Sequence, residues 1–119
     1  MVIFQVVIDA GYGMTPDQCE YGGRLFAALA NPARLRILEH LARSTASVNE
    51  IADAAGLKQS ITSQHLAALL SAGVVVYERN GNQRIYRLRG PRIARILELV
   101  EEFYEVHLDS LRQVLARHS

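Results

Sequence analysis

The sequence contains very little cysteine and no tryptophan. Its single cysteine, Cys19, excludes an intrachain disulfide framework and a zinc site built from a cysteine cluster. A chain without disulfides suits a reducing compartment, so we expect it in the cytoplasm. A lone cysteine on an apolar helix is usually a core residue, and we expect the same of Cys19.

The sequence also lacks a long hydrophobic run. The opening stretch, MVIFQVVI, has eight residues, whereas a membrane-spanning helix needs roughly 20. It has no basic leader and no small-residue cleavage site close behind it, so we expect no signal peptide. A nucleophile–base pair, a phosphate-binding glycine loop and a carboxylate dyad are missing too, and we therefore predict that the protein is not an enzyme.

The composition is that of a globular protein with an uneven charge distribution. Half of the 119 residues are apolar, which predicts one domain with a modest core. The formal net charge is only +1, yet the segment from Arg79 to Arg95 contains six arginines and no acid. Such a segment is either a solvated charge run or a surface that contacts phosphate.

The starts of three helices are marked by capping residues. The sequence TPDQ at residues 15–18 has a capping threonine, a proline at the first helical position and a glutamine at the third. The pair NP at residues 31–32 again places a proline at the first helical position, after a capping asparagine. The sequence SVNE at residues 47–50 is a capping box, and its helix ends at Gly56. We predict these helices over residues 16–29 and 32–43, and a short third helix, IADAA, after the capping box.

A fourth helix, a hairpin and a long last helix follow. Residues 59–72 have helical periodicity, and Gly73 marks their end. The runs VVVYER and QRIYRLR flank Asn80-Gly81-Asn82, which is a strong hairpin signal. From Pro91 onward there is no further glycine or proline, so we predict one helix of about 27 residues, roughly 40 Å long.

These elements predict a mainly α fold with a β-hairpin wing, that is, a winged helix-turn-helix. We expect three regions: residues 1–14 as an apolar, strand-like extension, residues 15–90 as the winged helix-turn-helix DNA-binding domain, and residues 91–119 as a long dimerisation helix. The run VIFQVVI has the β-branched content of a strand but no partner strand nearby. It is an added strand or a segment lent to another subunit.

The segment IADAAGLKQSITSQHLAALL has the spacing of a helix-turn-helix, whose second helix enters the major groove of DNA. Apolar residues at helical spacing in this second helix are expected to face the core: Ile61, Leu66, Leu69 and Leu70. Its short polar side chains, and the arginines and asparagines of the hairpin, suit base edges and phosphates. The predicted DNA-binding residues are Lys58, Gln59, Ser60, Thr62, Ser63, Gln64, Arg79, Asn80, Asn82 and Arg84.

The chain resembles the ArsR/SmtB family of bacterial repressors over about residues 22–97. The resemblance rests on ALANPARLRILEHL, SVNEIADAAGLKQSITSQHLAALLSAGVV and ERNGNQRIYRL, and above all on the motif Ser60-x-x-Ser63-x-His65-Leu66. It implies a homodimeric winged-helix repressor that blocks a promoter until an effector, often a metal ion, weakens DNA binding. It also implies that His65 is a DNA-binding residue of the recognition helix rather than a metal ligand.

We expect the first and last helices to form the dimer, with double-stranded operator DNA as the other partner and no membrane. The last helix carries an apolar stripe at helical spacing, against which the first helix would pack. Two recognition helices would then reach successive major grooves about 34 Å apart. The predicted interface residues are Leu25, Phe26, Leu29, Ile93, Ile96, Leu97, Val100, Phe103 and Tyr104.

One effector site of the family is missing from this sequence. The family builds it from cysteines near the start of the short helix before the recognition helix, where this chain has Ser47 and Asn49. We therefore expect no soft-metal or arsenite site there. The redox and persulfide sensors of the family need a cysteine pair, which one cysteine cannot supply within a chain.

The last helix carries Glu105-x-His107, ten further residues and His118, which matches the spacing of the family's other metal site. The two histidines are separated by about 16 Å along a helix, so only an antiparallel partner helix can bring them to one ion. The register argues against this match. Counted from the end of the hairpin, the family's ligand positions fall on four residues that are not ligands: Gly90, Arg92, Phe103 and Val106.

Two interpretations of this tail therefore stay open. As metal ligands, Glu105, His107 and His118 suit Zn²⁺ or Ni²⁺. Otherwise the two histidines line the far end of an extended packing face. At the level of function, the alternatives are the same fold with a non-metal effector or with none, and a winged-helix protein-interaction module.

Overall fold

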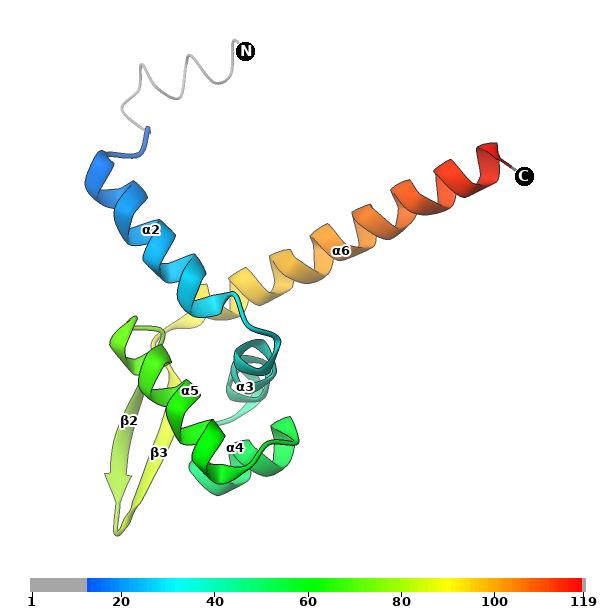
Figure 1. Cartoon of the computed structure of the whole chain (residues 1–119). Helices are drawn as coiled ribbons and strands as arrows, with labels where there is room; N and C mark the ends of the chain where they lie inside the picture. Colours follow the sequence, from blue (N-terminus) through cyan, green and yellow to red (C-terminus); the bar gives the residue numbers. More distant parts are fainter. Residues whose placement is uncertain (1–12, 119) are drawn as a thin grey trace.

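The computed structural model describes residues 13–118, and the predicted strand-like run near the start of the chain lies outside these residues. The element order confirms a mainly α fold with a hairpin wing (Figure 1). The elements are α2 (Pro16–Leu29), α3 (Pro32–Arg43), β1 (Ala46–Ser47), α4 (Val48–Ala55), α5 (Gln59–Ser71), β2 (Val75–Asn80), β3 (Gln83–Leu88) and α6 (Pro91–Arg117).

The predicted caps set the starts of the helices. The Thr15 hydroxyl accepts a hydrogen bond from the Gln18 backbone N–H at 3.1 Å, and the Gln18 side chain accepts one from the Thr15 N–H. Asn31 Oδ1 accepts two backbone N–H groups at the start of α3, and Ser47 forms a second capping box before α4. These bonds satisfy donors that a helix leaves unpaired at its first turn. Lys58 stands at the N-cap of α5 and provides no side-chain cap.

The hairpin belongs to a three-stranded sheet in the order β1-β3-β2. Strands β2 and β3 are antiparallel, with Asn80 opposite Gln83 across a two-residue loop. Gly81, the first loop residue, has a φ of 65°, a conformation that type II′ hairpin turns require at this position. The short strand β1 was not predicted, and it pairs Ala46 with Tyr86 on the other edge of β3.

The core lies between α3, α4, α5 and the sheet. Its largest fully buried side chains include Ile37, Leu38 and Ile51, together with Leu66 and Leu69 of α5. This packing confirms the predicted inward positions of Leu66 and Leu69, but the prediction for Ile61 was wrong. Ile61 is 39% exposed, and Thr62 is fully buried on the face of α5 where Ile61 was expected. The buried positions 62, 66 and 69 follow the four- and three-residue steps of one helix face.

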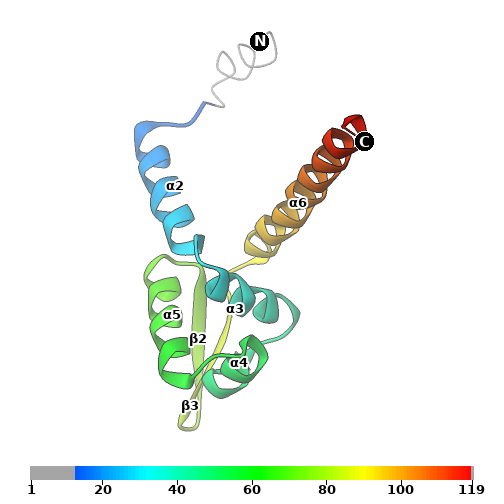
Figure 2. The ribbon, with the colours of Figure 1, turned by 45° about the vertical axis from the view of Figure 1, so that its right-hand side comes forward.

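Helices α2 and α6 leave this body on the side opposite the tip of the hairpin and diverge from each other (Figures 1 and 2). Most of their apolar residues are exposed in the isolated chain: α2 buries only Leu29, and α6 buries none of its residues. Cys19, which we expected in the core, is exposed on α2. Among the described residues, no helix is both long enough and apolar enough to cross a membrane.

Candidate DNA-binding surface

The turn between α4 and α5 fixes the recognition helix on the body. Gly56 ends α4 with a φ of 68° and a ψ of 37°, the left-handed conformation that glycine adopts at helix ends. The Leu57 N–H then donates to the Ala52 carbonyl at 2.9 Å, which closes the turn. Helix α5 starts two residues later at Gln59 and runs beside the hairpin (Figure 2). The outer face of α5 and the wing therefore lie side by side on the surface of the protein.

The N-terminal half of α5 exposes most of the predicted polar residues. Gln59, Ser60, Ser63 and Gln64 are all exposed, and so is Lys58 at the N-cap. Thr62 is different: its side chain is fully buried, and its hydroxyl donates to the Lys58 carbonyl at 2.9 Å. The prediction of Thr62 as a DNA-contacting residue was therefore wrong, because its one hydroxyl proton is used inside the helix and its side chain faces the core.

His65 faces α3 rather than open solvent. The Arg34 Nε–H donates to His65 Nδ1 at 3.2 Å, and the Arg34 Nη1–H donates to the Ala28 carbonyl at 3.0 Å. Burial, and then the nearby Arg34 charge, lower the pKa of His65 below its ordinary value, which favours the neutral imidazole that can accept this bond. The half-buried His65 thus ties the recognition helix to the junction between α2 and α3, a contact between residues 31 positions apart.

The wing presents the predicted arginines and asparagines on exposed backbone. Arg79, Asn80, Asn82 and Arg84 are all exposed. The Arg84 guanidinium lies 4.4 Å from the centre of the Tyr77 ring, a cation–π contact that holds the side chain against the hairpin. A hydrogen bond to the Tyr86 side chain, followed by electrostatic interaction with Tyr77, raises the pKa of Arg84. The wing therefore carries a fixed positive charge.

Helix α5 and the wing line one hollow of about 460 Å³, which we call the α5–wing hollow. Its lining residues are Ser47, Val48, Asn49, Gln59, Arg79, Asn82, Gln83 and Arg84. Four of these residues were predicted from the sequence. Gln83 could have been found from the hairpin register, because it lies opposite Asn80. The start of α4 left no sequence signal, because the pairing of β1 with β3 brings it here.

The fold agrees with comparisons to known proteins. The family described as "Bacterial regulatory protein, arsR family" matches residues 31–77. The homodimeric winged helix-turn-helix DNA-binding domain of Mb0332 from Mycobacterium bovis, a possible ArsR-family transcriptional regulator, is 35% identical with a TM-score of 0.72. The match covers 82% of this chain and 94% of that one.

This chain belongs to the ArsR family. Two further similar proteins illustrate the likeness. The antimony-specific transcriptional repressor AntR is 34% identical with a TM-score of 0.70, over 80% of this chain and 86% of that one. The transcriptional repressor SmtB of Mycobacterium tuberculosis is 43% identical over 75 residues, or 63% of this chain. The chain spans 38% to 56% of the length of the first curated relatives it matches.

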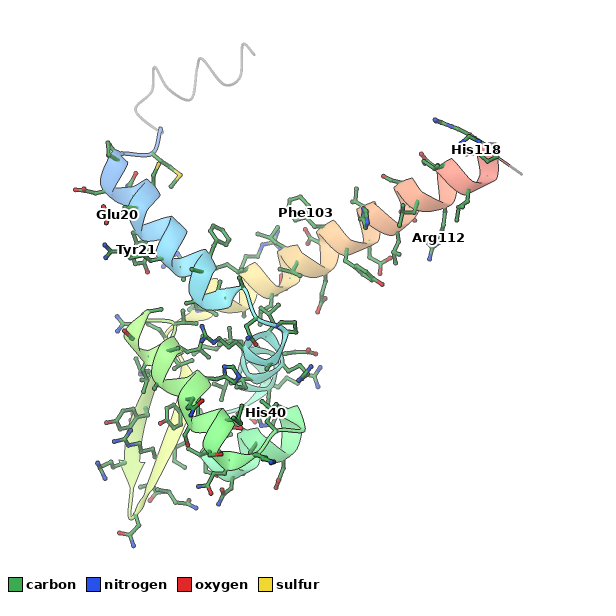
Figure 3. All side chains as sticks on the ribbon, in the orientation of Figure 1. Glu20, Tyr21, His40, Phe103, Arg112 and His118 are labelled. Atoms are coloured by element: carbon green, nitrogen blue, oxygen red, sulfur yellow. The ribbon has the colours of Figure 1, made fainter. Side chains whose placement is uncertain are left out.

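Several apolar residues that were predicted to form the ArsR-type dimer are exposed on α2 and α6. Phe26 is 64% exposed on α2. Phe103, which Figure 3 labels on α6, is 73% exposed. Val100 and Tyr104 are exposed as well, whereas Leu25, Ile93, Ile96 and Leu97 are partly buried against the core. The prediction for Leu29 was wrong: it is 6% exposed, so it packs within its own chain and has little surface left for a partner.

The possible metal ligands of this ArsR-family chain lie apart from one another. Glu105, His107 and His118 are all exposed on α6, with His118 at its far end (Figure 3). Residues 13–118 contain no group of three or more His, Cys, Asp or Glu side chains that could hold a metal ion. The three residues of one chain therefore do not fit a metal site.

Proposed function

We propose that this chain is a sequence-specific DNA-binding transcriptional repressor that acts as a homodimer on a double-stranded operator in the bacterial cytoplasm. The observation that carries the proposal is the α5–wing hollow, in which Gln59 of the recognition helix and two wing arginines face the same space. One element is suited to base edges and the other to phosphate. Membership of the ArsR family supports the same function.

The two elements would share the work of binding. The N-terminal residues of a recognition helix contact base edges in the major groove. Gln59, Ser60, Ser63 and Gln64 supply amide and hydroxyl groups there, and glutamine suits the donor–acceptor pair of adenine. Arg79 and Arg84 would contact phosphate or the minor groove beside the site. Most of the affinity would then be electrostatic and most of the specificity would come from α5.

The homodimer is supported by the uncovered apolar residues of α2 and α6 and by the homodimeric state of the Mb0332 domain. A two-fold dimer would bury Phe26 and Phe103 and place two copies of α5 about one helical turn of DNA apart. The operator would then be a palindrome of two half-sites. The predicted interface, without Leu29, would cover four of the large apolar side chains that the isolated chain leaves exposed: Phe26, Val100, Phe103 and Tyr104.

Two alanine variants test the assignment of roles. Arg84→Ala is expected to weaken binding to all DNA sequences and to flatten the salt dependence of log K by about one unit for each phosphate that the protein no longer neutralises. Gln59→Ala is expected instead to change the sequence preference, with about 1–3 kcal/mol less discrimination at one base pair. Fluorescence anisotropy with operator and scrambled duplexes, at several salt concentrations, measures both effects.

Arg112→Ala is the matched control, because it removes the same charge from the far part of α6, where Arg112 pairs with a neighbouring acid of its own helix (Figure 3). It should bind DNA like the wild type. If Arg84→Ala and Gln59→Ala also bound like the wild type, the α5–wing hollow would not be the DNA surface. Failure of the wild-type chain to bind its own promoter region would favour a protein-interaction module.

A response to Zn²⁺ or Ni²⁺ stays a prediction that needs two chains. The name of AntR specifies antimony, so metal-specific repressors occur among the relatives. Here the single chain offers no metal cluster among residues 13–118, and only His107 of one chain with His118 of another could approach one ion. A non-metal effector, or none, is the alternative.

A promoter gel shift with and without Zn²⁺ and Ni²⁺ separates these alternatives. If the histidines sense metal, the wild type should release DNA at metal concentrations that leave His107→Ala bound. His40→Ala serves as the control, since it removes an imidazole from α3 and leaves α6 unchanged. The same metal response in wild type and His107→Ala would show that His107 is not a sensor ligand.

A further inference from the structure

Ile61 is an exposed apolar residue in an unexpected place. Between residues 27 and 99, all of which the structure describes, it is the only exposed large hydrophobic side chain. The others lie on or just before α2, and on α6 from Val100 onward, where a partner chain would cover the two helices. Ile61 lies instead in the first turn of the recognition helix, so the dimer does not account for its exposure.

Packing within the chain does not account for it either. Thr62, Leu66 and Leu69 form the buried face of α5, and Ile61 lies beside that face rather than on it. Its neighbours one turn onward are Gln64, which is exposed, and His65, which is half-buried and bonded to Arg34. A β-branched residue at an exposed helix position also has a poorer helix propensity than alanine, so local structure gives no reason for it.

The chemistry of the major groove supplies a reason. Base pairs present hydrogen-bond donors and acceptors there, and the only apolar group among them is the C5-methyl of thymine. An isoleucine among glutamines and serines can contact that methyl group, while its polar neighbours bond to adjacent base edges. A protein partner suits Ile61 less well, because it is one apolar side chain in a polar surrounding and not a contiguous patch.

We propose that Ile61 contacts a thymine methyl group in each half-site of the operator and thereby selects thymine at that position. This inference rests on the proposed function, since it requires α5 in the major groove. It adds an apolar contact to the polar contacts assigned to Gln59, Ser60, Ser63 and Gln64. Because the contact is made by dispersion and methyl burial, it does not depend on salt.

Deoxyuridine tests the proposal, because it pairs like thymidine and lacks only the methyl group. The operator is first selected from random duplexes with the wild-type protein, and each thymine is then replaced in turn by deoxyuridine. At one position in each half-site, wild-type affinity should fall about fourfold, the value expected for one buried methyl group. With Ile61→Ala, the thymine and deoxyuridine duplexes should bind equally at that position.

Gln64→Ala is the matched control on the same turn, and it should keep the difference between thymine and deoxyuridine. Ile61→Val should keep part of it, because valine retains the branched shape. If every deoxyuridine effect were the same in wild type and Ile61→Ala, this inference would be overturned while the DNA-binding function stood. If the wild type selected no sequence at all, the proposed function would fall and the inference with it.

Discussion

Phe103→Glu is expected to convert the proposed homodimer into monomers and to lower operator affinity about 10²- to 10⁴-fold, because two linked binding modules gain that much over one. Phe103 is 73% exposed in the isolated chain and extends from α6 beyond the body (Figure 3). In a two-fold dimer the substitution occurs twice, so two charges would enter an apolar interface without partners. Analytical ultracentrifugation gives the oligomeric state, and a gel shift gives the affinity.

Gln113→Glu is the control for Phe103→Glu. It places the same charge on the same helix, at an exposed position that lies off the apolar stripe. This variant should remain dimeric and bind DNA like the wild type. A dimeric Phe103→Glu protein with wild-type affinity would place the subunit interface elsewhere than on this part of α6.

The polar side of α6 supports the same orientation. Arg95 pairs with Glu98 at 3.0 Å and with Glu102 at 3.2 Å, and Arg112 pairs with Asp109 at 3.1 Å. All five side chains are more than half exposed, so the pairs lie on a solvated side of the helix and contribute little to stability. The charged residues therefore lie on two different surfaces. Arg79 and Arg84 lie on the wing near α5, and the ion pairs lie along α6.

Local signals in the sequence were enough to predict most of the fold. The capping residues at Thr15, Asn31 and Ser47 act within three or four positions of the chain, and so does the glycine in the hairpin loop. Their effects do not depend on distant contacts, and the structure shows each of them where the sequence placed it. The same holds for α6, which has no internal residue that would break a helix.

Predictions that depended on distant contacts were less successful. Strand β1 has only two residues, so it leaves no alternating pattern, and its pairing with β3 is a tertiary contact. The error at Ile61 and Thr62 is a shift of one residue: Thr62, and not Ile61, lies on the buried face of α5. Its apolar character made Ile61 the better candidate for burial. The Thr62 hydroxyl, however, donates a hydrogen bond to the Lys58 carbonyl, which lowers the free-energy cost of burying the threonine.

In the candidate site too, features set by local sequence were predicted and features set by distant contacts were not. The exposed residues of α5 and the wing could be predicted, because each belongs to a local element. The bond from Arg34 to His65 joins residues from two helices and gives His65 a structural partner that the motif alone did not indicate. Residues at the start of α4 line the hollow because β1 pairs with β3, and the sequence did not indicate that pairing.

Leu66→Ala is expected to lower the free energy of unfolding by about 2–5 kcal/mol, the range for removing a large side chain from a packed core. Leu66 is fully buried on α5, where the recognition helix packs against α4, α3 and the sheet. This decrease is a large share of the roughly 5–15 kcal/mol that stabilises a typical domain. Operator binding should weaken as well, because α5 would no longer be held firmly beside the wing.

Ile61→Ala is the control for Leu66→Ala, since it shortens an aliphatic side chain on the same helix at an exposed position. Its free energy of unfolding should lie within about 0.5 kcal/mol of the wild type. Urea denaturation measures both variants, at one fixed protein concentration because a dimer's stability depends on it. If Ile61→Ala were destabilised as much as Leu66→Ala, Ile61 would be a packing residue, and the outer face of α5 would have to be assigned again.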